Sequence, residues 1–191
     1  SRVLVIPRQA LGPLPDSGVW PLAASSEPLP WLWLERERAE TDEAFLQVIP
    51  YALLRDAAGR LWCYERLVGD DRVRHRYSCG VGGHVDEADG RDDLAATVAC
   101  ALQRELSEEL GWRPDEAGMG TSAWLYEGFS AIGRVHLGWV FVLDWAGPDA
   151  PCPAPGEPLG SLGFIAAERI MADARFECWS QLAAAWSVGQ S

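Results

Sequence analysis

The segment R-E-L-S-E-E-L-G-W, residues 104 to 112, places three glutamates directly before a glycine. Glu105, Glu108 and Glu109 are spaced i, i+3 and i+4, so they share one side if this segment is helical. Like charges at this spacing repel one another, and the C-terminal end of a helix is the unfavourable end of its dipole for anions. The cluster is therefore either a solvated acidic face or a site where a bound divalent cation offsets the repulsion.

The sequence on both sides predicts that these glutamates lie at the end of a long helix. Residues 94 to 110 are rich in alanine and leucine and contain neither glycine nor proline. Asp92 or Asp93 is suited to cap the N-terminus, and Gly111 is placed to end the helix in a left-handed conformation. An apolar stripe runs beside the glutamates, formed by Leu102, Leu106 and Leu110. The carboxylates are thus expected at the border of the buried face.

The rest of the chain is dominated by patterns typical of β-strands. Apolar, β-rich runs flank residues 56 to 59, which predicts a hairpin. Residues 72 to 77 alternate arginine with Val73, His75 and Tyr77, which predicts another strand. Further strands are expected in residues 2–8, 122–131, 134–145 and 163–166, with helical structure in 175–186 and irregular structure up to about residue 30. Strands, one long helix, more strands and a final helix predict a mixed α/β domain.

Composition and charge restrict the function. The chain has 191 residues, 48% of them hydrophobic, and a net charge of −12, which suits a globular domain but not a protein that binds a nucleic acid polymer. All 16 basic residues are arginine, which excludes Schiff-base lysine chemistry and the lysine of a Walker phosphate loop. The 5 cysteines are scattered and no apolar run reaches the ~18 residues of a membrane span. Reduced thiols, no membrane association and a cytoplasmic location are therefore expected.

The segment G-G-H-V-D-E-A-D-G, residues 82 to 90, precedes the predicted helix. Together with residues 104 to 112 it resembles the Nudix box of the Nudix hydrolases, G-x5-E-x7-R-E-U-x-E-E-x-G-U, where U is a large apolar residue. The second half of this pattern is matched at every specified position, by Arg104, Glu105, Leu106, Glu108, Glu109, Gly111 and Trp112. The chain is similar to a MutT-like branch with G-G-H before its loop, over roughly residues 30 to 182.

The first half of the box departs from the family pattern. Ala96 occupies the position eight before Arg104, where the family has a glutamate. Counting six onward from Gly83 gives Asp89, but fourteen residues instead of seven then separate it from Arg104. A seven-residue insertion accounts for this difference, either as extra helical turns or as a longer loop. Asp89 or Asp86 then stands in for the loop glutamate.

The resemblance implies a fold, a cofactor and roles for individual residues. Nudix proteins have a mixed β-sheet sandwiched between α-helices, so a single domain over residues 1–191 is expected, with residues 1–44 as an N-terminal extension packed on it. Family members mostly hydrolyse a diphosphate linkage in a nucleoside diphosphate joined to another moiety, using Mg²⁺ or Mn²⁺. The implied metal ligands are Glu105, Glu108, Glu109 and a backbone carbonyl of Gly82 or Gly83. Arg104 is implied to orient these carboxylates, and the implied general base is Glu108 or a glutamate from a distant loop, for which Glu157 is the candidate.

Other polar residues allow more than one interpretation. Arg72, Arg74 and Arg76 form either a phosphate-binding row on one strand face or a solvent-exposed charged strand. His84 either contacts a substrate phosphate or makes a structural hydrogen bond in its loop. His136, in a predicted strand, is expected to be an ordinary strand residue.

Three functions are compatible with these features. The first is a Mg²⁺-dependent Nudix hydrolase acting on a nucleotide-type small molecule, and a homodimer is expected for it. The second is a non-catalytic ligand-binding or regulatory module, which the altered loop favours. The third, an isomerase of the same fold, needs a catalytic cysteine that no cysteine here is obviously placed to supply. Nucleotide sugars, dinucleoside polyphosphates, oxidised nucleoside triphosphates and NADH- or coenzyme A-type molecules are all open as substrates.

Overall fold

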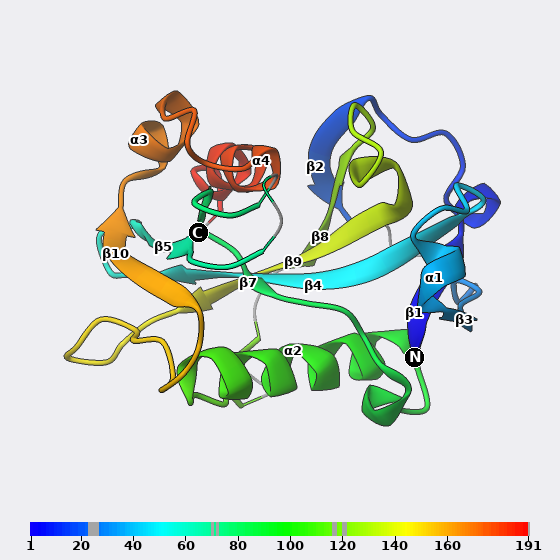
Figure 1. Cartoon of the computed structure of the whole chain (residues 1–191), viewed down its shortest axis with the longest axis horizontal. Coiled ribbons are helices and arrows are strands. Elements are labelled where there is room, and N and C mark those ends of the chain that lie inside the picture. The colour runs from blue at the N-terminus through cyan, green and yellow to red at the C-terminus, as the bar shows by residue number, and fades with distance from the viewer. Residues whose placement is uncertain (23–26, 70, 72, 116–117, 120–121, 191) are drawn as a thin grey trace.

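A mixed β-sheet lies between two layers of helix (Figure 1). The computed structural model describes residues 1–22, 27–69, 71, 73–115, 118–119 and 122–190. On one face of the sheet lies α2, Leu94–Leu110, and on the other face lie α3, Ala167–Ala172, and α4, Cys178–Ser187. This arrangement confirms the predicted α/β class, with a mixed sheet between helices.

The main path of the sheet runs in the order β10-β5-β4-β9-β8-β2. These strands are β10 (Leu159–Ile165), β5 (Leu61–Arg66), β4 (Phe45–Arg55), β9 (His136–Asp144), β8 (Ser122–Glu127) and β2 (Ser17–Pro21). β4 and β9 are parallel at the centre, and the other neighbouring pairs are antiparallel. The hairpin between β4 and β5 and the strands β8, β9 and β10 confirm the corresponding predictions.

Further strands extend the sheet at its side. They are β1 (Arg2–Pro7), which pairs with β4 and with β3 (Leu32–Glu35), β6 (Tyr77–Ser78), which pairs with β5, and β7 (Val81–Gly82), which pairs with β4. A single short helix, α1 (Arg36–Ala39), follows β3 in the described chain. Residues 2–35 thus supply strands to the same sheet, and the division into one domain with an extension over residues 1–44 stays a prediction.

Two apolar clusters fill the spaces between the sheet and its helices. Strand β9 is buried along nearly its whole length, because helices cover both faces of the sheet, and its sequence is accordingly a continuous apolar run. The cluster toward α2 includes Leu102 and Leu106 of the predicted apolar stripe. The cluster toward α4 includes Val140, Phe176 and Ala183. Among the described helices, none has both the length and the apolar character needed to cross a bilayer.

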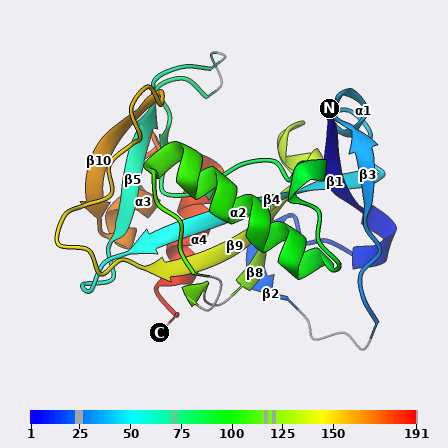
Figure 2. The same cartoon turned by 90° about the horizontal axis from the view of Figure 1, so that it is seen from below.

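Helix α2 begins and ends where the sequence predicts. The Asp93 carboxylate caps its first turn by accepting a hydrogen bond from the Ala96 amide at 2.7 Å. Gly111 follows its last residue with a left-handed φ of 61°. Seen from below, α2 crosses the strands β4 and β9 (Figure 2). Because Leu102 and Leu106 point into the core, the glutamates beside them lie at the edge of the buried face.

The prediction of a strand over residues 72–77 is wrong for most of that segment. Residues 73–75 form a turn, with a φ of 62° at His75, and the strand is limited to β6. Arg72 lies outside the described residues. The chain reverses direction between β5 and β6, and the His75 amide closes this reversal by donating to the Arg66 carbonyl at 2.7 Å. Long-range pairing of β6 with β5 therefore overrides the local alternation of the sequence.

The irregular structure expected before residue 30 is also only partly present. Residues 8–11 form a 3-10 turn and Ser17–Pro21 form β2, which pairs with β8 at the edge of the sheet. An edge strand tolerates proline and glycine, because one of its sides makes no ladder hydrogen bonds. Pro21 at the end of β2 is therefore compatible with a strand that local signals disfavour.

Candidate active site

The three clustered glutamates lie near the end of α2 and differ in exposure. The side chain of Glu105 is 15% exposed and that of Glu108 is 57% exposed. Oε2 of Glu109 is buried and has no hydrogen-bond partner among the described residues. At least two of the three carboxylates are therefore held partly out of water, which argues against a purely solvated acidic face.

Arg104 links this cluster to the loop before the helix. Its guanidinium donates two hydrogen bonds of 2.9 Å to the carboxylate of Asp89, from Nε and from Nη2. It also donates to Glu105 Oε1 at 2.8 Å and to the His84 carbonyl at 3.0 Å. Asp86 lies 3.9 Å from Arg104. Of the two candidate replacements for the loop glutamate, Asp89 is thus the one that makes the bidentate contact.

A short 3-10 turn, η2 (Glu87–Asp89), presents Asp89 to Arg104. The Asp86 amide donates to Asp89 Oδ2 at 2.9 Å, as in a capping box, and Asp89 is only 2% exposed. Helix α2 begins at Leu94, which is farther before Arg104 than the seven residues that the family pattern leaves between its loop glutamate and its arginine. The additional residues of the box therefore lengthen the helix at its N-terminal end. The insertion is therefore accommodated without separating Arg104 from its acidic partner in the loop.

The cluster is costly to ionise without a counter-ion. Burial raises the pKa of Glu109 to about 8, and the charge of Glu105 adds to this rise, while Arg66 opposes it. Burial also raises the pKa of Glu105. A nearby divalent cation would stabilise the ionised carboxylates and remove this cost.

The donor types suit a hard divalent cation, but the carboxylate oxygens of the three glutamates do not all lie within 4.8 Å of one another in this conformation. Carboxylate oxygens are the ligands that such ions prefer, and an unpartnered buried oxygen of Glu109 is available. Gly83 lies directly against this site, because a Cβ added to Gly83 would come within 2.6 Å of Glu105 Oε1. Glycine here lets the backbone approach the carboxylate closely. The role of a Gly82 or Gly83 carbonyl as a further ligand stays a prediction.

We expect Gly83→Ala to weaken divalent-cation binding by about 10- to 100-fold, because the new methyl group displaces the Glu105 carboxylate. Free Mn²⁺ measured by electron paramagnetic resonance during a titration gives the affinity. Gly118→Ala is the matched control, since a Cβ added there has no atom within 4 Å. An unchanged Mn²⁺ affinity in Gly83→Ala would remove Gly83 from the site.

The proline-rich loop after β9 brings Glu157 close to the acidic cluster. The Ala154 amide donates to the backbone carbonyl of Glu109 at 2.7 Å, which holds this loop against the end of α2. After burial and the charge of Glu105, the charge of Glu157 also raises the pKa of Glu109. The position of Glu157 suits a base from a distant loop, and that role stays a prediction.

The strand on which the arginine row is expected is replaced by a turn at residues 73–75, which includes Arg74. Arg74 is exposed, and Arg72 is outside the described part of the chain. Arg76 faces a cavity, where its guanidinium donates to the carbonyls of Ala174 at 3.1 Å and Phe176 at 3.0 Å. The expectation of a shared strand face is therefore wrong for Arg74 and Arg76, of which only Arg76 lines the cavity.

A cavity of about 1140 Å³ opens beside Gly82, Gly83 and His84. The arginines of its wall are Arg36, Arg66 and Arg76. They share the wall with the carboxylates of Glu40, Asp71, Glu127 and Glu177, so the wall carries both signs of charge. The guanidiniums are the groups of this wall that suit anionic oxygens. Sequence reasoning missed Arg36 and Arg66, because neither belongs to a motif and only long-range packing brings them to the cavity.

Sequence comparison gives a partial match to a curated protein. No family model matches the chain. Protein YmaB of Bacillus subtilis (strain 168) is 32% identical over 114 residues, which cover 58% of this chain and 55% of YmaB. The match therefore spans about half of the length of that relative.

Comparison with solved structures is more informative. The chain matches Tm1382, a protein proposed to be a Nudix hydrolase, with a TM-score of 0.75 over 97% of each chain at 24% identity. The chain has the Nudix fold. A Nudix hydrolase from Alicyclobacillus acidocaldarius also matches, with a TM-score of 0.56 over 75% of this chain and 91% of the other at 12% identity.

A third match is to a bifunctional protein that was solved with a nucleotide and a metal ion. A bifunctional NMN adenylyltransferase/ADP ribose pyrophosphatase from Francisella tularensis, solved with AMP and a Mn ion, gives a TM-score of 0.52 at 14% identity. The match covers 75% of this chain and 40% of the Francisella protein. Within the Nudix fold of the present chain, residues 104–110 of the segment that resembles the Nudix box lie on α2, and Gly111 and Trp112 follow it. The G-G-H segment lies on the cavity wall.

Proposed function

We propose that this protein is a Mg²⁺-dependent Nudix hydrolase that cleaves a diphosphate linkage in a nucleoside diphosphate derivative. The observation that carries the proposal is the partly buried cluster of carboxylates on α2, held by Arg104 beside a cavity with arginines on its wall. Such a cluster is unfavourable unless a cation binds to it, and a cation with nearby arginines suits a diphosphate ligand.

The carboxylates of Glu105, Glu108 and Glu109, with the Gly83 carbonyl, would hold Mg²⁺. When bound, this ion supplies charge neutralisation for phosphate oxygens and acidifies a water molecule. Arg104 fixes the orientation of Glu105 and keeps Asp89 paired, so its role is one of positioning.

Other polar residues are assigned to bind the substrate and to accept the proton of the attacking water. Arg76 and His84 line the cavity, where we assign them to the phosphate-binding side. Glu108 is more than half exposed, so water reaches its carboxylate, and we assign it to accept the proton of the attacking water. Glu157, near the same cluster, is the alternative base.

The test is turnover of a panel of nucleoside diphosphate derivatives with Mg²⁺ or Mn²⁺ in ¹⁸O-enriched water, with products identified by mass spectrometry. We expect cleavage at a diphosphate linkage, with one ¹⁸O atom in one phosphate product. Products with an unchanged mass would indicate an isomerase instead. No turnover of any panel member, together with no Mn²⁺ binding, would contradict the hydrolase and favour a non-catalytic binding module, for which the altered loop of the box is the supporting feature.

A further inference from the structure

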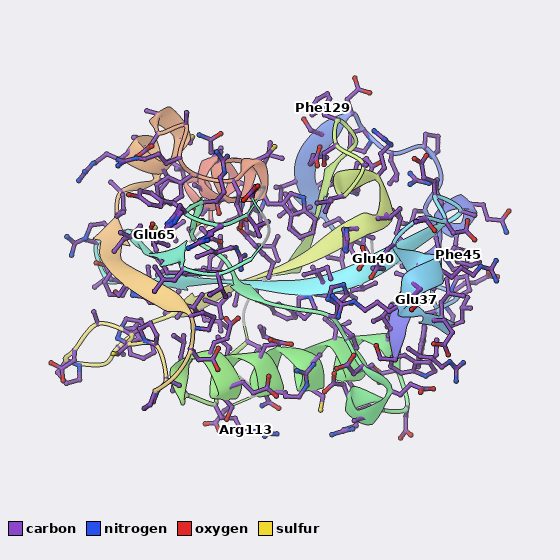
Figure 3. All side chains as sticks on the ribbon, viewed as in Figure 1. Glu37, Glu40, Phe45, Glu65, Arg113 and Phe129 are labelled. Atoms are coloured by element: carbon purple, nitrogen blue, oxygen red, sulfur yellow. The ribbon has the colours of Figure 1, made fainter. Side chains whose placement is uncertain are left out.

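Three side chains that can bind a metal meet on the cavity wall, apart from the carboxylates of α2. Glu40 directly follows α1, His84 follows β7, and His136 is the first residue of β9. Their potential ligand atoms all lie within 4.8 Å of one another. All three residues line the cavity (Glu40 is labelled in Figure 3). The group therefore combines two imidazoles and one carboxylate from three separate segments.

The hydrogen bonding of His136 prepares its ring for a ligand. Its Nδ1 lies 2.7 Å from the Ile132 carbonyl oxygen, which can only accept a hydrogen bond. Nδ1 therefore carries the proton, and Nε2 carries the free lone pair. This is the arrangement in which a histidine that binds a metal is usually held, with its second nitrogen donating to a carbonyl or carboxylate.

His84 has a buried nitrogen that no described residue satisfies. Its Nε2 is enclosed and makes no hydrogen bond within the described part of the chain. Glu40 Oε1 lies 3.9 Å away, which is too far for a hydrogen bond. The rings of His84 and His136 are in edge-to-face contact, with centroids 5.6 Å apart. A buried polar atom without a partner is costly, so a missing ligand for Nε2 is the direct explanation.

We propose that Glu40, His84 and His136 form a second cation site, for a divalent transition-metal ion of the Zn²⁺ class, with its remaining coordination position open to the cavity. Two imidazoles and a carboxylate with an open position are the donor set of several catalytic zinc sites. Imidazole nitrogen suits Zn²⁺, Co²⁺ or Ni²⁺, whereas Mg²⁺ prefers oxygen. The open position suits an anionic oxygen, such as a phosphate oxygen of a substrate. His84 would then act on the substrate through this ion.

The geometry needs only small movements to reach coordination distances. With all separations within 4.8 Å, a cation at the centre of the group lies at most about 2.8 Å from each ligand atom, and movements of about 0.7 Å bring the bonds to ~2.0–2.1 Å. Glu40 is free to supply this movement, because its side chain is 38% exposed and its hydrogen bond from Arg36 is long, at 3.5 Å. Arg36, which also lines the cavity, is the positive charge that opposes the cation.

The test is a titration of metal-free protein with Co²⁺, followed by visible absorption. We expect one equivalent to bind with the absorption bands of a site of low coordination number, and Glu40→Ala or His136→Asn to weaken this binding by at least about 10- to 100-fold. Glu37→Ala is the matched control, since Glu37 is an exposed glutamate of α1, the short helix that Glu40 follows (Figure 3), and does not line the cavity.

Two further variants keep the outcome unambiguous. Glu109→Gln must keep the Co²⁺ bands, because that residue belongs to the α2 cluster. Cys178→Ser must keep them too, because Cys178 lines the same cavity and is the competing thiol ligand. The proposal would be overturned if the bands survived Glu40→Ala and His136→Asn, or if they were lost in Glu109→Gln or Cys178→Ser. The absence of Co²⁺ binding to the wild-type protein would also overturn it. Glu40 is exposed, so its variant is expected to fold even if His136→Asn does not. The assignment does not depend on the hydrolase activity.

Discussion

Glu109→Gln is expected to lower turnover of the substrate found in the panel by about 10²- to 10³-fold, the effect typical of removing one group that stabilises the transition-state charge. The reason is that Glu109 supplies a buried carboxylate with an unpartnered oxygen, for which a neutral amide is a poor replacement. Mn²⁺ affinity is expected to fall in parallel, which gives a measurement independent of activity. Glu168→Gln is the control, because it makes the same change at an exposed position of α3, on the opposite face of the sheet. Equal turnover in wild type and Glu109→Gln would exclude Glu109 from the metal site.

The same variant has a second signature in the pH dependence of the metal-free protein. Burial, with the charge of Glu105, raises the pKa of Glu109 from 4.5 to about 8, so between these values the folded protein binds more protons than the unfolded protein. The stabilisation linked to Glu109 is therefore complete below pH 4.5 and is lost as the pH rises through about 8. In EDTA, wild type is expected to lose free energy of unfolding over this range relative to Glu109→Gln. Parallel pH profiles from chemical denaturation would contradict the buried position of this carboxylate.

Arg104→Met is expected to lower the free energy of unfolding by about 3 kcal/mol at neutral pH, the lower end of the range for breaking a buried ion pair, because Arg104 itself is partly exposed. The substitution leaves the Asp89 carboxylate, which is 2% exposed, without its bidentate partner. It also removes the hydrogen bond that Glu105 receives. Urea denaturation of the metal-free protein measures the change.

The controls for this prediction separate buried from exposed charge. Arg38, on α1, forms an exposed ion pair with Asp42, at 3.1 Å. Arg38→Gln removes this pair and is expected to lower the free energy of unfolding by no more than about 0.5 kcal/mol. The double variant Arg104→Met with Asp89→Asn removes the isolated charge and is expected to recover part of the loss. If Arg104→Met were no more harmful than Arg38→Gln, the Arg104 pair would not stabilise the loop.

The acidic helix could be predicted in detail because its signals are local. The N-cap at Asp93, the glycine at position 111 and the i, i+3, i+4 spacing of the glutamates act within single turns of helix. The apolar stripe at Leu102 and Leu106 likewise fixed which side of α2 faces the sheet. The sequence alone thus located the carboxylates at the edge of the core.

Only the tertiary structure decided between Asp86 and Asp89 as the partner of Arg104. Both residues are acidic and close in sequence, so spacing does not separate them. A distant strand holds the loop in place, because the Leu4 amide of β1 donates a hydrogen bond to the Val85 carbonyl of the loop at 3.0 Å. Contacts across some eighty residues of sequence carry no local signal.

The contrast between local signals and contacts of distant segments also explains the other features that the sequence did or did not predict. The sequence by itself determined the α/β class, the long helix with its three glutamates and the hairpin of β4 and β5, because periodicity, capping and turn chemistry act between near neighbours. It failed for the turn at residues 73–75 and for β2, where pairing with a distant strand decides the conformation. Only the tertiary structure brought Arg66 to the cavity and gathered Glu40, His84 and His136, because the packing of separate strands places these side chains together and no spacing along the chain encodes it.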